Sequence, residues 1–224
     1  MIHSFQQIIT GSSVLPESMI FSGGRDDRSV PIVFSFFYLR TDHRSILVDT
    51  SCFTMPGMEL ENPIPPDEAL LSHGVHPEDV TDVVITHAHH DHIEGVRCFP
   101  QATFYMQTDE YLHGGKACFP ENARMVCFQD EYLLDDLRIK RIGGHSIGSC
   151  VAEFLFHGRQ CVIGGDECYS YANILRHIPT ANPYCPVNAS QFIETYARPE
   201  WLVLLPHQPI NSDSFNLSTN SNSF

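Results

Sequence analysis

The 224-residue sequence lacks three features that would place it in common protein classes. It has no run of about 18 apolar residues, the length that a membrane-spanning helix needs, so we expect no membrane span. The N-terminus has neither a basic nor a sustained apolar segment, so we expect no signal peptide and a cytoplasmic protein. Eight cysteines occur without a single C-x-x-C pair, which argues against a structural zinc knuckle and favours free thiols.

Positive charge is also scarce. The chain has 13 Lys and Arg against 27 Asp and Glu, a formal net charge of −14. Such a surface repels polyphosphate, so nucleic acid and anionic membranes are not expected as partners. No glycine pair is followed by Gly-Lys-Ser, so a phosphate-binding loop is not indicated. We expect a small-molecule substrate, and the sequence leaves a homodimer open.

The order of apolar and polar segments predicts alternating strands and helices. No linker divides them, so we predict one domain over residues 1–210 and a polar tail over 211–224 that frays. The segment 110–126 is predicted to be a helix followed by a loop. Strands are predicted at 30–40, 45–51, 82–86, 102–107 and 201–206, hairpins at 133–144 and 151–166, and helices at 66–74, 93–99 and 189–197.

The stretch THAHHDHIEG, residues 86–95, concentrates histidine around one aspartate. In an extended segment side chains alternate, so His87, His89 and Asp91 project to one side. His92 follows where the chain turns into a helix, which lets it swing back to the same centre. These are ligand types that zinc and similar metals take. His90 projects to the other side and is expected to be a pocket wall or a surface residue.

Further donors are expected from strand ends elsewhere, because ligands from one loop do not enclose a site. His145 lies in GGHSIGS, Asp166 ends the apolar run CVIGGD, and His207 follows WLVLLP. Strand ends are where α/β folds collect their chemistry. Each residue alone is more simply an exposed polar residue, but together with the 86–95 cluster they predict a metal site.

In this order, the motifs resemble those of the metallo-β-lactamase-fold hydrolases over residues 30–210. The resemblance implies an α/β fold, a four-layer αβ/βα sandwich of two mixed sheets with helices outside, and a dinuclear metal centre between the sheets. Asp49 matches a carboxylate that orients a ligand imidazole. The implied ligands are His87, His89 and His145 for one metal, Asp91, His92 and His207 for the other, and Asp166 as the bridge.

Two divalent cations about 3.5–4 Å apart lower the pKa of a shared water, which yields a hydroxide nucleophile, and polarise the substrate oxygen. The implied activity is therefore metal-dependent hydrolysis, with Asp91 as one candidate catalytic residue. Zinc is the expected metal, and iron or manganese stays open because selectivity depends on geometry and supply.

The nearest resemblance is to the N-acyl-homoserine-lactonase-like branch, which favours a lactone or related ester as substrate. Members carry a tyrosine three residues after the bridging aspartate, and Tyr169 matches it. Its hydroxyl could donate to the substrate, or the ring could simply pack in the core. The loop CFTMPGM, 52–58, could line a groove for an acyl chain or pack as an ordinary loop. His90 departs from the bulky apolar residue usual in this branch.

Other members of the resembled family are weighed by what the chain lacks. Only 17 residues, rich in Ser and Asn, follow His207, so we do not expect a glyoxalase-II-like thioesterase with its C-terminal helical domain. The net charge of −14 argues against the basic arm of ribonuclease-Z-like nucleases. Cys168 could mimic the cysteine ligand of antibiotic-degrading β-lactamases, but Asp166 fits better. The remaining alternatives are another thioesterase or phosphodiesterase activity, a mononuclear-iron persulfide dioxygenase, and a non-catalytic metal-binding protein.

Overall fold

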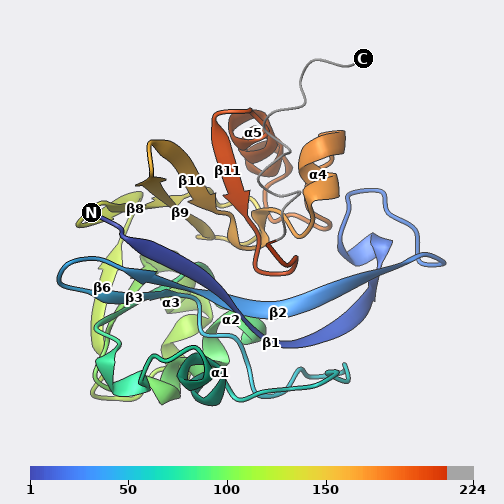
Figure 1. Ribbon diagram of the computed structural model, residues 1–224. Coiled ribbons are helices and arrows are strands. Elements are labelled where there is room, and N and C mark those ends of the chain that lie inside the picture. The colour runs from blue at the N-terminus through green and yellow to red at the C-terminus, as the bar shows by residue number, and fades with distance from the viewer. Residues whose placement is uncertain (211–224) are drawn as a thin grey trace.

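The computed structural model describes residues 1–210, and the predicted tail at 211–224 lies outside the described residues. Two sheets face each other (Figure 1). In sheet order, the first consists of β1 (Ser4–Pro16), β2 (Ser29–Arg40), β3 (Ser45–Val48), β4 (Asp82–Ile85), β5 (Thr103–Gln107) and β6 (Arg124–Phe128). The second consists of β11 (Trp201–Leu204), β10 (Arg159–Ile163), β9 (Cys150–Phe156), β8 (Leu137–Arg141) and β7 (Glu131–Leu134).

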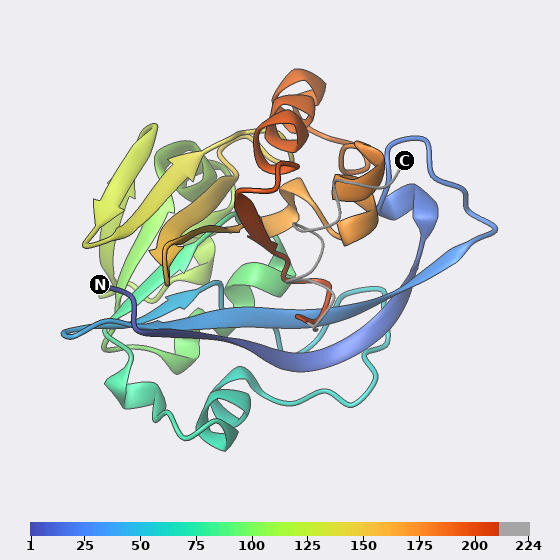
Figure 2. The same ribbon diagram turned by 45° about the horizontal axis from the view of Figure 1, so that its top comes forward.

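Both sheets are mixed. Strands β1, β2 and β3 pair antiparallel, whereas β3 to β6 are parallel. In the second sheet β10 and β11 are parallel and the other pairs antiparallel. Helices cover the outer faces, as Figures 1 and 2 show. The first sheet carries α1 (Pro66–Ser72), α2 (His90–Ile93) and α3 (Thr108–His113), and the second carries α4 (Tyr171–Arg176) and α5 (Pro186–Tyr196). The predicted sandwich of two mixed sheets is confirmed.

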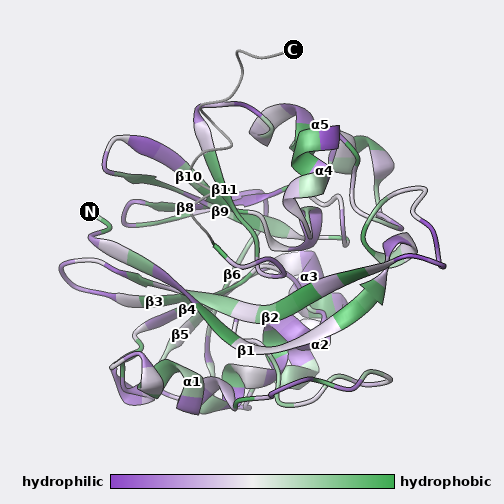
Figure 3. Ribbon diagram, turned by 45° about the vertical axis from the view of Figure 1, so that its right-hand side comes forward, coloured by the Kyte–Doolittle hydropathy of each residue, from purple (hydrophilic) through white to green (hydrophobic). Residues whose placement is uncertain are grey.

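Apolar side chains form one buried layer between the sheets and one beneath each set of helices. The central layer joins residues such as Val48 and Val84 of the first sheet to Ile139 and Ile163 of the second. Figure 3 shows hydrophobic segments along the strands and mostly hydrophilic turns between them. Burial on both faces explains why the central strands are short apolar runs in the sequence.

Parallel pairing places the carboxyl ends of several strands at one edge of the sandwich. Strands β3, β4 and β5 run in the same direction, as do β10 and β11. The segments that follow β4, β10 and β11 contain the histidine cluster, Asp166 and His207. The topology therefore gathers residues that are far apart in the chain.

Four features of the structure differ from the sequence prediction. Strand β1 was not predicted, because glutamine, serine and glycine interrupt its apolar alternation and its register shifts between Ile9 and Gly11. The segment 110–126 ends in β6 rather than in a loop, and α4 was missed. Strand β10 stops at Ile163, so Asp166 lies in a short 3-10 turn, Gly165–Glu167, instead of ending the strand.

A buried carboxylate fixes the edge of the sandwich opposite the histidine loop. Asp82 begins β4 and is 2% exposed, and both of its oxygens accept from the Arg44 Nη1 at 2.8 and 2.9 Å. The Tyr105 hydroxyl donates to the same carboxylate at 2.9 Å. Arg44 also reaches Asp135 at 2.9 Å, in the turn of the second sheet. This network links the two sheets.

We expect Asp82→Asn to lower the free energy of unfolding by about 1.5–3 kcal/mol, because hydrogen bonds to a charged group are lost while the Arg44 cation stays in place. Urea unfolding measures the change. Asp135→Asn is the matched control, since its carboxylate is 40% exposed and should contribute under about 1 kcal/mol. Equal losses in both variants would contradict the special role of the buried carboxylate.

Candidate metal centre

The structure brings the seven predicted ligand residues together at the strand ends. Within each of two groups, the potential ligand atoms lie within 4.8 Å of one another. The first group contains His87, His89, His145 and Asp166, and the second contains Asp91, His92 and His207. This division matches the one that the resemblance implied, and the ligand roles themselves stay predictions.

The local backbone conformation explains how one loop contributes residues to both groups. The chain stays extended after β4 as far as His89 and becomes helical at His90. His87 and His89 therefore point to the first group, while the helical turn carries Asp91 and His92 to the second. His90 points away from both groups, with its Nε2 3.0 Å from the Glu94 carboxylate.

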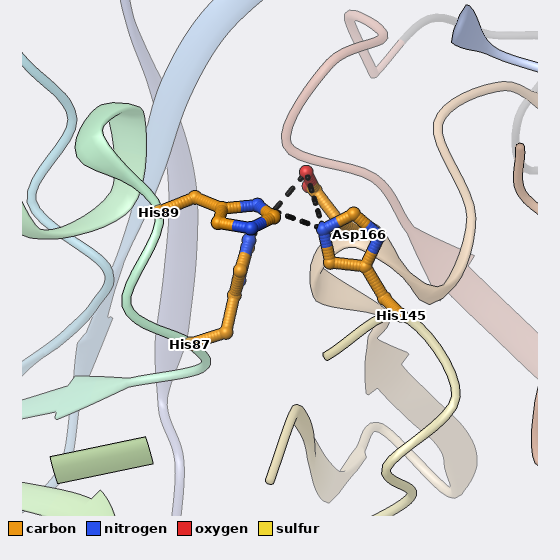
Figure 4. Close-up of side chains that lie close together, drawn as sticks. All are labelled: His87, His89, His145 and Asp166. Atoms are coloured by element: carbon orange, nitrogen blue, oxygen red, sulfur yellow. Dashed lines mark hydrogen bonds and ion pairs between the residues drawn. The ribbon is translucent and has the colours of Figure 1, made fainter. Parts of the chain in front are cut away.

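Asp166 lies between the two groups and turns one oxygen toward each. Its Oδ2 is 3.6 Å from the Nε2 of both His87 and His145. Its Oδ1 is 3.0 Å from His92 Nε2 and 3.1 Å from His207 Nε2. Figure 4 shows the rings of the first group facing this carboxylate.

The inward-facing atoms lack the partners that buried polar groups normally have. The Nε2 atoms of His87, His92 and His207 and the Oδ1 of Asp166 are buried, and none makes a hydrogen bond of good geometry. Buried polar groups are otherwise almost always satisfied, so convergent unpaired donors of these types fit a bound cation. The residues present therefore fit divalent metal.

Two rings of the first group are held in the form that binds metal. Burial lowers the pKa of His87 well below its ordinary value, and burial lowers the pKa of His145 to about 4. Both imidazoles are thus neutral at physiological pH. A neutral ring offers the free nitrogen lone pair that coordination needs.

The second group is oriented by acceptors behind its rings. Asp49 Oδ2 accepts from His92 Nδ1 at 2.8 Å, and the Val33 carbonyl accepts from His207 Nδ1 at 2.9 Å. Asp49 also accepts the Thr86 backbone N–H at 2.8 Å. Because Nδ1 is engaged outward, Nε2 is the atom left facing the centre. Asp49 thus lies where an orienting carboxylate is expected.

Two buried glutamates were missed in the sequence. Glu110 accepts from the loops on both sides of the first group, and Glu167 accepts the backbone N–H of Gly144 and His145 at 3.0 and 3.1 Å. Burial raises the pKa of Glu167 to about 7 against the opposing hydrogen bonds. Glu110 resembles an ordinary acid in the first turn of a helix, so no local pattern indicates that its side chain points inward.

Tyr169 lies beside the centre. Its ring stacks on His207 with centroids 4.9 Å apart and lies 6.0 Å from the His145 ring, and its hydroxyl interacts with Asp166. The short turn after β10 breaks strand alternation and brings the phenol to this position. Cys168 is a buried thiol that donates to the Ser170 carbonyl and belongs to neither ligand group.

Two hollows flank the centre and share Met19, His89 and Tyr169. One, of about 700 Å³, lies beside the first group and also contains His113, Asn182 and Tyr184. The other, of about 360 Å³, lies beside Asp91 and His207, and its wall is mostly apolar: Leu15, Ile32, Phe34, Met55, Pro56 and Met58. His90 is part of that wall. Within residues 1–210, no helix is long and apolar enough to cross a membrane.

Comparison with known proteins agrees with the geometry. Residues 31–197 match the metallo-beta-lactamase superfamily. A probable metallo-hydrolase of Methanocaldococcus jannaschii is 33% identical over 136 residues, which cover 60% of this chain and 56% of that protein. A 48-residue stretch, 21% of this chain, is 52% identical to metallo-beta-lactamase domain-containing protein 1 of Rattus norvegicus and covers 19% of it. The chain thus spans between about a fifth and just over half of these relatives.

Solved structures show the same fold over nearly the whole chain. An N-acyl homoserine lactone hydrolase with N-hexanoyl-L-homoserine at its catalytic metal centre has a TM-score of 0.78 at 19% identity, covering 92% of this chain and 94% of that one. A dizinc quorum-quenching lactonase has a TM-score of 0.73 at 16% identity, covering 92% and 87%. With the match over residues 31–197, the chain belongs to the metallo-beta-lactamase superfamily, and its His and Asp side chains form a cluster that could hold metal ions.

Proposed function

We propose that this protein is a dinuclear metal-dependent hydrolase that acts on a lactone or a related ester with an apolar acyl arm. The observation that carries the proposal is the position of Asp166, which presents one carboxylate oxygen to each of two separate sets of ligand atoms. A carboxylate between two cations is the arrangement that dinuclear hydrolytic sites use.

The first ion would be held by His87, His89 and His145, the second by Asp91, His92 and His207, and Asp166 would bridge both. When bound, two divalent ions acidify water and draw charge from the substrate's carbonyl oxygen. Zinc suits this set of imidazoles and carboxylates, while iron and manganese are the alternatives. Seven donors exceed what a single four-coordinate ion needs, which favours two ions.

Tyr169 would act on the substrate oxygen. It lines both hollows and is held by stacking on His207. Burial and the nearby Asp166 raise the pKa of Tyr169 well above its ordinary value, so the phenol keeps its proton and stays a hydrogen-bond donor. A donor fixed in place before the reaction stabilises the oxygen as negative charge develops on it.

Asp91 would help to hold the second ion and would also act on the leaving group. Its Oδ2 lies 3.5 Å from His207 Nε2 and 3.7 Å from His92 Nε2, and the residue also lines the apolar hollow. A carboxylate in that position can take up or return a proton at the ester oxygen. This is the role that we assign to it.

The apolar hollow supports the substrate class. Its volume of about 360 Å³ suits a short acyl chain, and the flexible methionine side chains of its wall can adapt to the shape of that chain. The loop 52–58 contributes Met55, Pro56 and Met58 to this wall, which supports the first of the two roles that the sequence left open, an acyl groove or ordinary packing. Two solved structures with the same fold, at low identity, hold or name an acyl-homoserine product.

A substrate panel with metal analysis tests the proposal. We expect the zinc-loaded protein to hydrolyse N-acyl lactones faster than thioesters, phosphodiesters or β-lactams, and to lose turnover after chelation and regain it with zinc. Rates that rise with acyl length would be consistent with the apolar hollow. Preference for a thioester or phosphodiester would contradict the lactone assignment. One ion at full activity would contradict the dinuclear centre.

We expect Tyr169→Phe to lower turnover on lactones by about 10²-fold or less, because one oxyanion donor is lost while the metal still shares the charge. Steady-state kinetics and metal content give the readout, and metal content should not change. Tyr196→Phe is the matched control, since its phenol donates to Glu153 on the far side of the second sheet. A loss of turnover equal in both variants, or none in Tyr169→Phe, would return Tyr169 to a packing role.

A further inference from the structure

Glu110 is a buried carboxylate outside both ligand groups. It lies in the first turn of α3, directly after β5, and only 4% of the residue is exposed. The Gln107 side chain caps this helix by accepting from Asp109 N–H at 2.6 Å and Glu110 N–H at 3.1 Å. The backbone of Glu110 is thereby fixed, and its side chain points toward the metal loops.

The carboxylate joins two loops that are distant in the chain. Oε2 accepts the Ala88 N–H at 3.0 Å, and Oε1 accepts the Gly148 N–H at 3.0 Å as well as the Ser146 hydroxyl. Ala88 lies between His87 and His89, and Ser146 directly follows His145. One side chain therefore holds the backbone on both sides of the first group.

We propose that Glu110 is a positioning residue that sets the affinity of the first metal position by holding the loops of His87, His89 and His145 at a fixed separation. The inference rests on the proposed dinuclear centre. Residues that orient ligands without touching the metal commonly change metal affinity when they are substituted. Glu110 acts here through backbone N–H groups rather than through an imidazole.

The approach of the second loop to Glu110 requires glycine. A Cβ placed on Gly148 would overlap the Gln107 side chain and come within 3.0 Å of the Glu110 Cγ. The loop therefore packs closely against the Gln107 and Glu110 side chains. On its other side, Glu167 accepts from His145 N–H, so the loop is fixed between two carboxylates.

The second group has a different support. His92 is oriented by Asp49 and His207 by the Val33 carbonyl, and neither contact involves Glu110. The two metal positions should therefore respond differently to the loss of Glu110. This difference separates a positioning role from a general effect on folding.

Glu110→Gln is the informative variant. The amide keeps the size of the side chain but replaces one accepting oxygen with an NH₂ group, which must then face a backbone N–H or the Ser146 hydroxyl. One N–H is left without an acceptor, and charge-assisted hydrogen bonds become neutral ones. The loops are expected to separate slightly while the helix cap at Gln107 remains.

The test measures zinc affinity in single-position backgrounds by competition with a chromophoric chelator. In the His207→Ala variant, zinc is confined to the first position, and adding Glu110→Gln should lower the zinc affinity of that position by about 10–100-fold. In His145→Ala, zinc occupies the second position, and adding Glu110→Gln should change affinity less than about threefold, under 1 kcal/mol. Equal weakening in both backgrounds, or in neither, would overturn the inference.

Asp82→Asn is the matched control, because it removes a buried carboxylate at the opposite end of β4. It should lower the urea midpoint of the metal-free protein without changing either zinc affinity. If Asp82→Asn lowers zinc affinity as Glu110→Gln does, the effect is global and the inference fails. A wild-type protein that binds one zinc would contradict the dinuclear proposal alone. The role of Glu110 is then tested by whether Glu110→Gln lowers the affinity for that single ion.

Discussion

The buried carboxylate of Asp166, surrounded by imidazole rings, is the constraint on which the arrangement of the site depends. An ionised carboxylate out of water costs several kcal/mol unless compensating charge lies close by. Here His87 and His145 are neutral because burial lowers their pKa, whereas Asp166 raises the pKa of the nearer His92 and His207 against the effect of burial. The Nε2 atoms of His87, His92 and His207 lack hydrogen-bond partners of good geometry. Divalent cations would take the place of the protons on His92 and His207 and give the unpaired atoms of both groups a partner. The two hollows then open onto the place where chemistry is expected.

The fold places hydrogen-bond acceptors behind several of the candidate ligands, on the side away from the centre. Parallel strands deliver the ligand loops to one edge, and Asp49, Glu110, Glu167 and the Val33 carbonyl fix the loops or rings there. These acceptors come from different elements of both sheets. A change at one acceptor is therefore expected to act on the metal position that this acceptor supports.

Much of the clustering could be predicted from sequence because the candidate ligands lie in short motifs at strand ends. Alternation in the extended segment places His87 and His89 on one side, and the helix that begins at His90 turns His92 back toward the centre. Glu110 and strand β1 could not be predicted, because an acid in the first turn of a helix and a polar edge strand have no distinctive local pattern. Their significance comes from contacts with residues far away in the chain. Tyr169 is intermediate: the resemblance suggested it, and only the turn at Gly165–Glu167 shows why the phenol reaches the cleft.

The central claim is that Asp166 separates two metal positions, and anomalous diffraction at the zinc edge tests it most directly. Crystals of the zinc-loaded protein should give two peaks on either side of the Asp166 carboxylate, one among the imidazoles of the first group and one beside Asp91, His92 and His207. A single peak, with Asp91 and His207 turned away from the metal, would contradict the account.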